Sequence, residues 1–154
     1  MINPELPRID QHQSLELPAT PKVLIEVNGL PHAPLVLART KEIMKAISAV
    51  AYTNSWPSEE AWKTRLPQWL VESMTSKTAE DRDKDPLLWH YASWIAAMKD
   101  RAWHWYSSSA TEDRLSIVLE LLGIPILYDA LLYILHAQGV NSLQLQVTDD
   151  VYDA

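Results

Sequence analysis

The sequence predicts a predominantly helical α+β fold, with four or five helices packed against a small sheet of two or three strands. Apolar residues recur at spacings of three and four over most of 40–139, as on the buried face of amphipathic helices. Two shorter segments, 22–38 and 141–148, are rich in β-branched or alternating apolar residues and indicate strands. Because 47% of the 154 residues are hydrophobic, the chain can bury one core.

Composition divides the chain into three parts. Residues 1–21 hold four of the ten prolines without any periodicity, which predicts an extended arm. Residues 22–148 carry the periodic patterns and predict a single globular α+β domain. Residues 149–154 are acidic and predict a tail at the surface.

The predicted sheet consists of an N-terminal hairpin and a C-terminal strand. Residues 22–27 form a β-rich run, Asn28-Gly29 is a strong turn signal, and 35–38 can return as the second strand. Residues 141–148 alternate apolar and polar side chains, as a half-buried strand does. A hairpin alone is marginally stable, so we expect this third strand to join it.

Capping residues and prolines predict where the helices begin and end. Thr40 caps a first helix, and Ser58 caps a second helix that Pro67 kinks or splits. Residues 76–85 are charged and predict an exposed loop. An Asp-Pro pair then begins a long helix over 86–106.

The last two predicted helices form an antiparallel hairpin. A capping-box pattern at 109–112 begins the first helix, and Gly123 ends it. Pro125 begins the second helix, which closes at Gly139. The short connection between them favours an antiparallel pair.

Charge and composition argue against several functions. The formal net charge of −7 repels nucleic-acid phosphates, so we expect no nucleic-acid binding. The chain has no cysteine, hence no disulfide and no thiolate metal site. The apolar stretch 115–135 is interrupted by Glu120 and Asp129, and the N-terminus lacks the pattern of a secretory signal. We therefore expect a cytoplasmic protein without a membrane span, metal or cofactor.

The candidate partner-binding residues are acidic clusters and one tryptophan. The acidic residues of 76–85 and of the tail offer a negative surface to a basic protein, although they can equally be a solvated loop and tail. The aromatic run 101–106 offers an anchor, although core packing also explains it. The predicted partner-binding residues are Glu80, Asp81, Asp83, Asp85, Trp103, Asp149 and Asp150.

A second group of polar residues interrupts the apolar segments near the C-terminus. Asp129, Tyr133 and His136 share one stripe of a predicted helix, a spacing that suits proton transfer if they line a pocket. Glu120 could meet them across the predicted helical hairpin, and two close carboxylates would shift each other's pKa. The alternative is that this stripe is the wet face of an amphipathic helix. The histidines lack the spacing of a helical metal pair.

Three classes of function fit these observations. The first is a protein-binding module, such as an immunity protein that inhibits a toxin by covering its basic active cleft. The second is a structural or assembly factor, for example a phage-type chaperone or adaptor. The third is a small acid–base enzyme that uses Asp129, Tyr133 and His136. Because no catalytic motif is recognisable, we expect the first class, a non-enzymatic chain with a protein partner.

Overall fold

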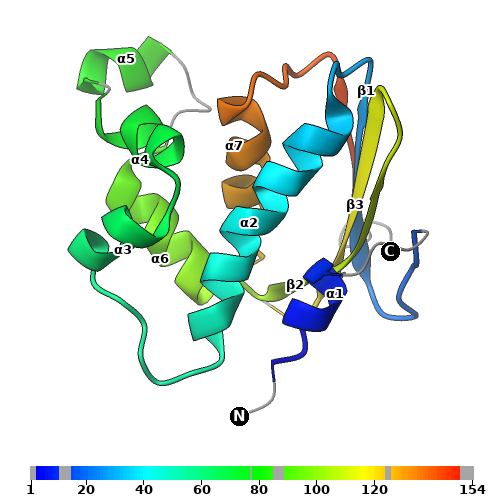
Figure 1. Cartoon of the computed structure of the whole chain (residues 1–154), viewed down its shortest axis with the longest axis horizontal. Coiled ribbons are helices and arrows are strands. Elements are labelled where there is room, and N and C mark those ends of the chain that lie inside the picture. Colours follow the sequence, from blue (N-terminus) through cyan, green and yellow to red (C-terminus); the bar gives the residue numbers. More distant parts are fainter. Residues whose placement is uncertain (1–2, 11–14, 77, 85–88, 124–125, 150–154) are drawn as a thin grey trace.

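A computed structural model describes residues 3–10, 15–76, 78–84, 89–123 and 126–149. These residues form an antiparallel sheet with helices against one face and residues 15–21 along the other (Figure 1). The α+β class is therefore confirmed. The sheet has four strands, in the order β2-β3-β1-β4, and not the two or three expected.

The register of the sheet explains which strand residues enter the core. The strands are β1 (Lys22–Asn28), β2 (Trp103–Ala110), β3 (Arg114–Leu121) and β4 (Leu145–Asp149). Ile25 on β1 lies opposite Ile117 on β3 and Val147 on β4, so these three share the face toward the helices. A β-bulge shifts the β2–β3 register between Trp105 and Ser107.

The helices form one long element and a group of shorter ones. They are α1 (Leu6–Asp10), α2 (Ala33–Ala51), α3 (Glu59–Arg65), α4 (Gln68–Thr75), α5 (Ala79–Lys84), α6 (Tyr91–Asp100) and α7 (Asp129–Ala137). Helix α2 crosses the sheet, and α7 lies beside it, between the sheet and the α3–α6 group (Figure 1). The indole N–H of Trp94 on α6 donates to the Ala130 carbonyl on α7 at 2.9 Å, which ties the two helices together.

The predicted N-terminal hairpin is wrong in its second strand. Residues 35–38 belong to α2, which begins after His32 and carries Pro34 in its first turn. Their apolar run is the start of the helix's buried stripe, which continues through Ile43 and Ile47. Thr40 is no cap but lies inside α2, where its hydroxyl donates to the Val36 carbonyl at 2.8 Å. The expectation that the C-terminal strand joins the sheet is confirmed, and the structure identifies β1 as its neighbour.

The predicted helices over 86–106 and 109–122 are also wrong in large part. Within the described residues, the first is only α6, and it gives way to strand β2; residues 86–88 lie outside the described part. The second is strand β3, which lies between β2 and β1. A central strand that is buried on both faces shows a continuous apolar run and not an alternating one. The second half of the predicted helical hairpin is confirmed as α7, with Gly139 at φ +98 just beyond its end.

The predicted extended arm contains a helix and is firmly packed. Glu5 and Ile9 are fully buried on and beside α1, and Asn3 caps this helix by accepting from the amides of Glu5 and Leu6. Residues 15–21 then follow the outer face of the sheet. There the Ser107 hydroxyl bonds to the backbone of Glu16, so that this segment covers the outer face of β2.

The middle of the chain follows the sequence more closely. Ser58 caps α3 through the Ala61 amide at 3.2 Å, and Pro67 separates α3 from α4, as expected. The predicted loop 76–85 instead contains the short helix α5. Asp149 ends β4 and so belongs to the sheet and not to the tail, while 150–154 lie outside the described residues. No helix among the described residues is long and apolar enough to span a membrane.

Candidate functional site

One hollow is a pocket of about 380 Å³ along α7, called here the α7 pocket. One wall is α7 itself, the second is the segment that leads into α6, and the third is the loop between α7 and β4. The lining residues are Trp89, His90, Asp129, Leu132, Tyr133, His136, Val140, Asn141, Ser142 and Leu145. Its apolar walls and polar groups together are what a binding pocket for a side chain or small molecule needs.

The α7 wall contains the three residues that the sequence grouped together. Asp129, Tyr133 and His136 all line the pocket, because positions four and seven residues apart share one stripe of a helix. Glu120 is not among the lining residues. It lies on β3 opposite His104 and accepts a hydrogen bond from the Thr20 hydroxyl at 2.8 Å. The expected meeting of two carboxylates is therefore wrong.

Tyr133 is held in place by α4. Its side chain is 2% exposed, and its hydroxyl donates to Ser73 Oγ at 2.5 Å. The Ser73 hydroxyl in turn donates to the Leu70 carbonyl at 2.6 Å. Both hydroxyl protons in this pair of hydrogen bonds are donated to groups of α4. The Tyr133 ring therefore forms part of the pocket wall, and its hydroxyl group links that wall to α4.

His90 has a structural task at the pocket's edge. Its Nδ1 accepts from the Ala92 amide at 3.3 Å and caps α6. A nitrogen that accepts a hydrogen bond carries no proton, so the cap requires the neutral ring with its proton on Nε2. The N–H that His90 can offer to a ligand is therefore the one on Nε2.

Asp129 supplies the negative charge of the pocket. It is exposed and lies in the first turn of α7, where the helix dipole favours a carboxylate. Leu127, just before the helix, has φ +56, an uncommon value for a residue other than glycine. Among the described residues, no group of three His, Asp or Glu side chains could hold a metal ion.

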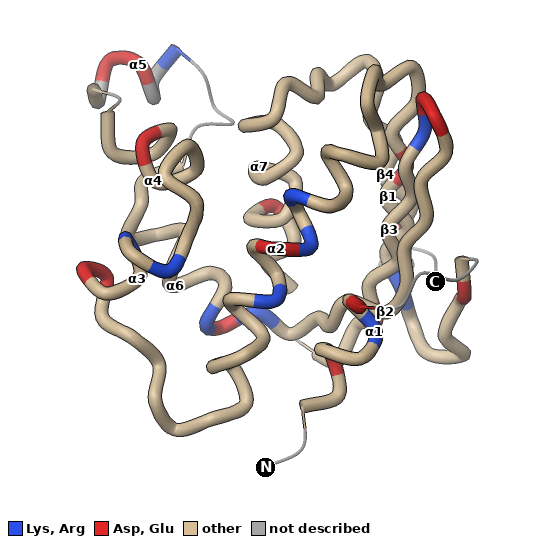
Figure 2. The backbone as a smooth tube through the Cα atoms, viewed as in Figure 1, with Lys and Arg blue, Asp and Glu red and all other residues tan. Residues whose placement is uncertain are grey.

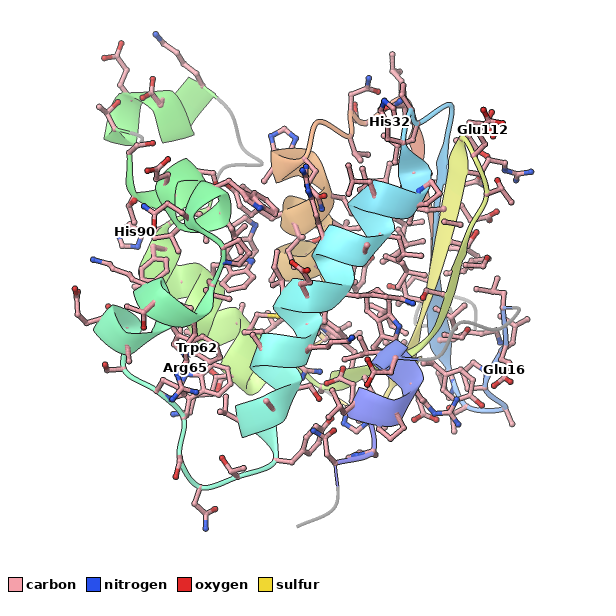
Figure 3. All side chains as sticks on the ribbon, viewed as in Figure 1. Glu16, His32, Trp62, Arg65, His90 and Glu112 are labelled. Carbon is pink, nitrogen blue, oxygen red and sulfur yellow. The ribbon has the colours of Figure 1, made fainter. Side chains whose placement is uncertain are left out.

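A second hollow is a shallow groove of about 700 Å³ at the start of α2, called here the α2 groove. It is lined by Pro31, His32, Pro34, Leu35, Glu112 and Asp113. Figure 3 shows His32 and Glu112 at the same end of the molecule, where α2 meets the tip of the β2–β3 hairpin. His32 has a left-handed backbone (φ 58, ψ 37), and Leu35 is 49% exposed.

The predicted partner-binding residues that the structure describes do not form one surface. Glu80 and Asp81 are exposed on α5, where Glu80 pairs with Lys84 at 3.3 Å and Asp81 accepts from the Thr78 amide at 3.1 Å. Asp149 is on β4, far across the molecule from α5 (Figure 2). Asp85, Asp150 and the side chain of Asp83 lie outside the described residues.

Trp103 as a partner anchor is wrong, because it is fully buried in the core. It is the first residue of β2, and its ring stacks under the Arg101 guanidinium, 4.8 Å away. Alternation in the run 103–106 is a strand pattern that places Trp103 and Trp105 on the buried face. This period of two in the sequence could have excluded Trp103 as an exposed partner-binding residue.

One buried ion pair escaped the sequence analysis. Arg101 Nη2 and Nη1 donate to Glu5 Oε1 and Oε2 at 2.7 and 2.9 Å, and the Trp105 amide donates to Glu5 Oε2 at 2.7 Å. Burial raises the pKa of the neighbouring Tyr52, with the Glu5 charge as a further cause. Burial also lowers the pKa of His104. Because Glu5 is fully buried, the cluster fastens α1 to β2 and offers no access to a substrate.

The α7 pocket and the α2 groove each offer both apolar and polar contacts. In comparisons with known proteins, no family model, no curated protein and no solved structure matches this chain.

Proposed function

We propose that this chain is an acidic protein-binding module that neutralises a partner protein by occlusion, as an immunity protein does with a toxin. In this proposal it acts in the cytoplasm, catalyses no reaction and needs no cofactor. The observation that carries the proposal is the α7 pocket, an open hollow with apolar walls on a chain of net charge −7.

The pocket has the form of an anchor site in a protein interface. Interfaces draw most of their affinity from a few side chains seated in well-packed pockets. Leu132, Val140 and Leu145 supply apolar contact for such a side chain, while Asn141 and Ser142 supply polar groups at the edge. The acidic balance of the chain would raise the association rate with a basic partner.

The decisive experiment is recovery of the partner followed by inhibition. The tagged chain is used to capture proteins from a lysate of its native source, and the captured protein is identified by mass spectrometry. Titration with the purified chain should then abolish the partner's activity at a one-to-one ratio. A captured partner that keeps its full activity in the complex would contradict occlusion.

A pair of variants links that inhibition to the pocket. Ser142→Trp fills the pocket from its exposed side, and Ala49→Trp adds the same bulk to an exposed position of α2. We expect Ser142→Trp to weaken partner binding at least roughly tenfold, since a blocked anchor pocket loses a dominant contact. Ala49→Trp should bind as the wild type does. Equal binding by both variants would remove the α7 pocket from the interface.

The second candidate is a small acid–base enzyme, favoured by the three residues Asp129, Tyr133 and His136 that line one pocket. In this candidate Asp129 and His136 would exchange protons with a substrate, since the Tyr133 hydroxyl donates to Ser73. The test compares a native metabolite extract after incubation with wild type or with Asp129→Asn. A compound consumed by wild type alone would establish the enzyme and overturn the binding proposal.

A further inference from the structure

Three loops meet at the end of the sheet where α2 begins. They follow β1 (29–32), join β2 to β3 (111–113), and precede β4 (141–144). Hydrogen bonds connect them: Gln144 Nε2 to the Gly29 carbonyl at 2.8 Å, the Asn28 amide to the Gln144 carbonyl at 3.0 Å, and the Leu30 amide to the Asp113 carbonyl at 2.9 Å. We call this end of the molecule the loop face.

The loop face joins the two hollows described above. Asn141 and Ser142 line the α7 pocket, while Gln144 of the same loop is bonded to the loop that carries the α2 groove. Leu143, which lies between Ser142 and Gln144 in this loop, is 96% exposed. The pocket, Leu143 and the groove therefore border one set of hydrogen-bonded loops.

The loop face exposes large apolar side chains to solvent. Among the described residues, the exposed large hydrophobic side chains are Leu17, Leu35, Leu122 and Leu143. Two of them, Leu35 and Leu143, lie on the loop face, with Pro31 and Pro34 between the same loops. Apolar side chains gathered at one end and framed by polar groups are typical of a protein-binding surface.

The carboxylates that line the α2 groove give it negative charge. Glu112 and Asp113 are both exposed and both line the α2 groove, and no lysine or arginine is among its lining residues. Both lie in the turn that joins β2 to β3, and Figure 3 shows Glu112 at the tip of that hairpin. The surface complementary to such a groove carries lysine or arginine next to an apolar side chain.

Backbone strain supports a binding role for the same loop. His32 keeps a left-handed conformation although it has a side chain, and this costs free energy that a glycine would avoid. The conformation sets the start of α2, so that Pro34 and Leu35 are exposed at the groove. Strained residues that persist in a fold concentrate at ligand-binding and functional sites.

We infer that the loop face docks a basic segment of the partner protein, with an apolar side chain in the α7 pocket and a lysine or arginine against Glu112 and Asp113. This inference rests on the proposed function and names the surface that performs it. It replaces α5 and the acidic C-terminus as the electrostatic contact.

The test uses two short capped peptides, one alternating lysine and leucine and the other alternating glutamate and leucine. Binding is followed by residue-resolved NMR of the whole chain. The lysine peptide should shift the amide signals of Leu35, Glu112 and Asn141, with an affinity that falls as salt is raised. The glutamate peptide should leave these signals in place. Shifts centred on α5 with the lysine peptide would overturn the inference.

A matched pair of double variants separates location from total charge. Glu112→Gln with Asp113→Asn and Glu59→Gln with Glu60→Gln remove the same charge, from the groove and from α3 respectively. We expect at least a fivefold loss of peptide affinity for the first variant and less than a twofold loss for the second. Equal losses would mean attraction to net charge alone and would overturn the inference.

Leu143→Ser provides a further arm in case the groove variant unfolds, because this side chain is almost fully exposed. It should weaken the lysine peptide severalfold and leave thermal stability unchanged. A natural partner that binds and is inhibited equally by Leu143→Ser and by the groove variant would overturn the inference and leave the proposed function standing. Failure to find any inhibited partner would instead count against the proposed function.

Discussion

Glu5 and Arg101, 96 positions apart, form a two-pronged ion pair that is almost completely shielded from solvent. The Glu5 side chain is 0% and the Arg101 side chain 4% exposed. Removing one member of a buried pair leaves the other charged and without its partner, which costs far more than losing a surface pair. The stability of the fold therefore depends on Glu5, which directly precedes α1.

We expect Glu5→Gln to lower the free energy of unfolding by about 3–5 kcal/mol. The control is Asp10→Asn, which removes the exposed ion pair between Asp10 and Lys45 and should cost about 1 kcal/mol or less. Urea unfolding of both variants measures the difference. Equal stabilities would mean that the N-terminal helix does not support the fold.

The half-buried His104 should make the fold sensitive to mild acid. Burial is the main cause of its lowered pKa, with Arg101 acting in the same direction and Glu5 and Glu120 opposing. The unfolded chain therefore binds this proton more readily than the folded chain, and stability falls as the pH drops below 6.5.

The His104 effect can be isolated by substitution. We expect His104→Gln to flatten the loss of stability between pH 6.5 and about 5, measured as the free energy of unfolding at each pH. An unchanged slope in His104→Gln would show that other groups cause the acid sensitivity.

The hydrogen bond from the Trp94 indole to the Ala130 carbonyl should contribute to the stability of the fold, because it joins α6 to α7, the helix that lines the pocket. Trp94→Phe leaves that carbonyl without its donor and opens a small cavity, and should cost about 2–4 kcal/mol. Trp69→Phe, at a half-buried tryptophan, should cost less. Thermal unfolding of the two variants provides the comparison.

Tyr133→Phe distinguishes a wall residue from an acid–base residue. The change removes only the hydroxyl that donates to Ser73, and should lower stability by about 0.5–1.5 kcal/mol. Partner binding should stay at the wild-type level, because the ring that lines the pocket is retained. A large loss of turnover of a small molecule, without a loss of folding, would favour the enzyme candidate.

Sequence reasoning succeeded where one pattern had one structural cause. Helix α7 has a single buried stripe and a glycine just beyond its end, and both marks were readable. Alternation predicted that the C-terminal segment forms a strand of the sheet, as β4 does. Helical spacing placed Asp129, Tyr133 and His136 on one stripe, and the structure shows that this stripe lines a pocket.

It failed where tertiary contacts change what a pattern means. Strand β3 has a continuous apolar run because its outer residue Val118 is also fully buried, on the face along which residues 15–21 run. Residues 35–38 resemble a returning strand, but the left-handed His32 turns the chain into α2. Glu112 and Leu143 were missed as surface residues because 109–112 resembles a helix capping box and 141–148 an alternating strand, whereas both residues lie in loops.

The bonds from the N-terminal segment to β2 also decide how the sheet meets other chains. β2 is an edge strand, and its backbone groups are taken by side chains: the Trp103 carbonyl by Arg101, the Trp105 amide by Glu5 and the Tyr106 carbonyl by Arg8. An edge whose donors and acceptors are occupied cannot recruit a foreign strand. The N-terminal residues Glu5 and Arg8 therefore hinder strand pairing at this edge. We expect a chain without them to self-associate through β2.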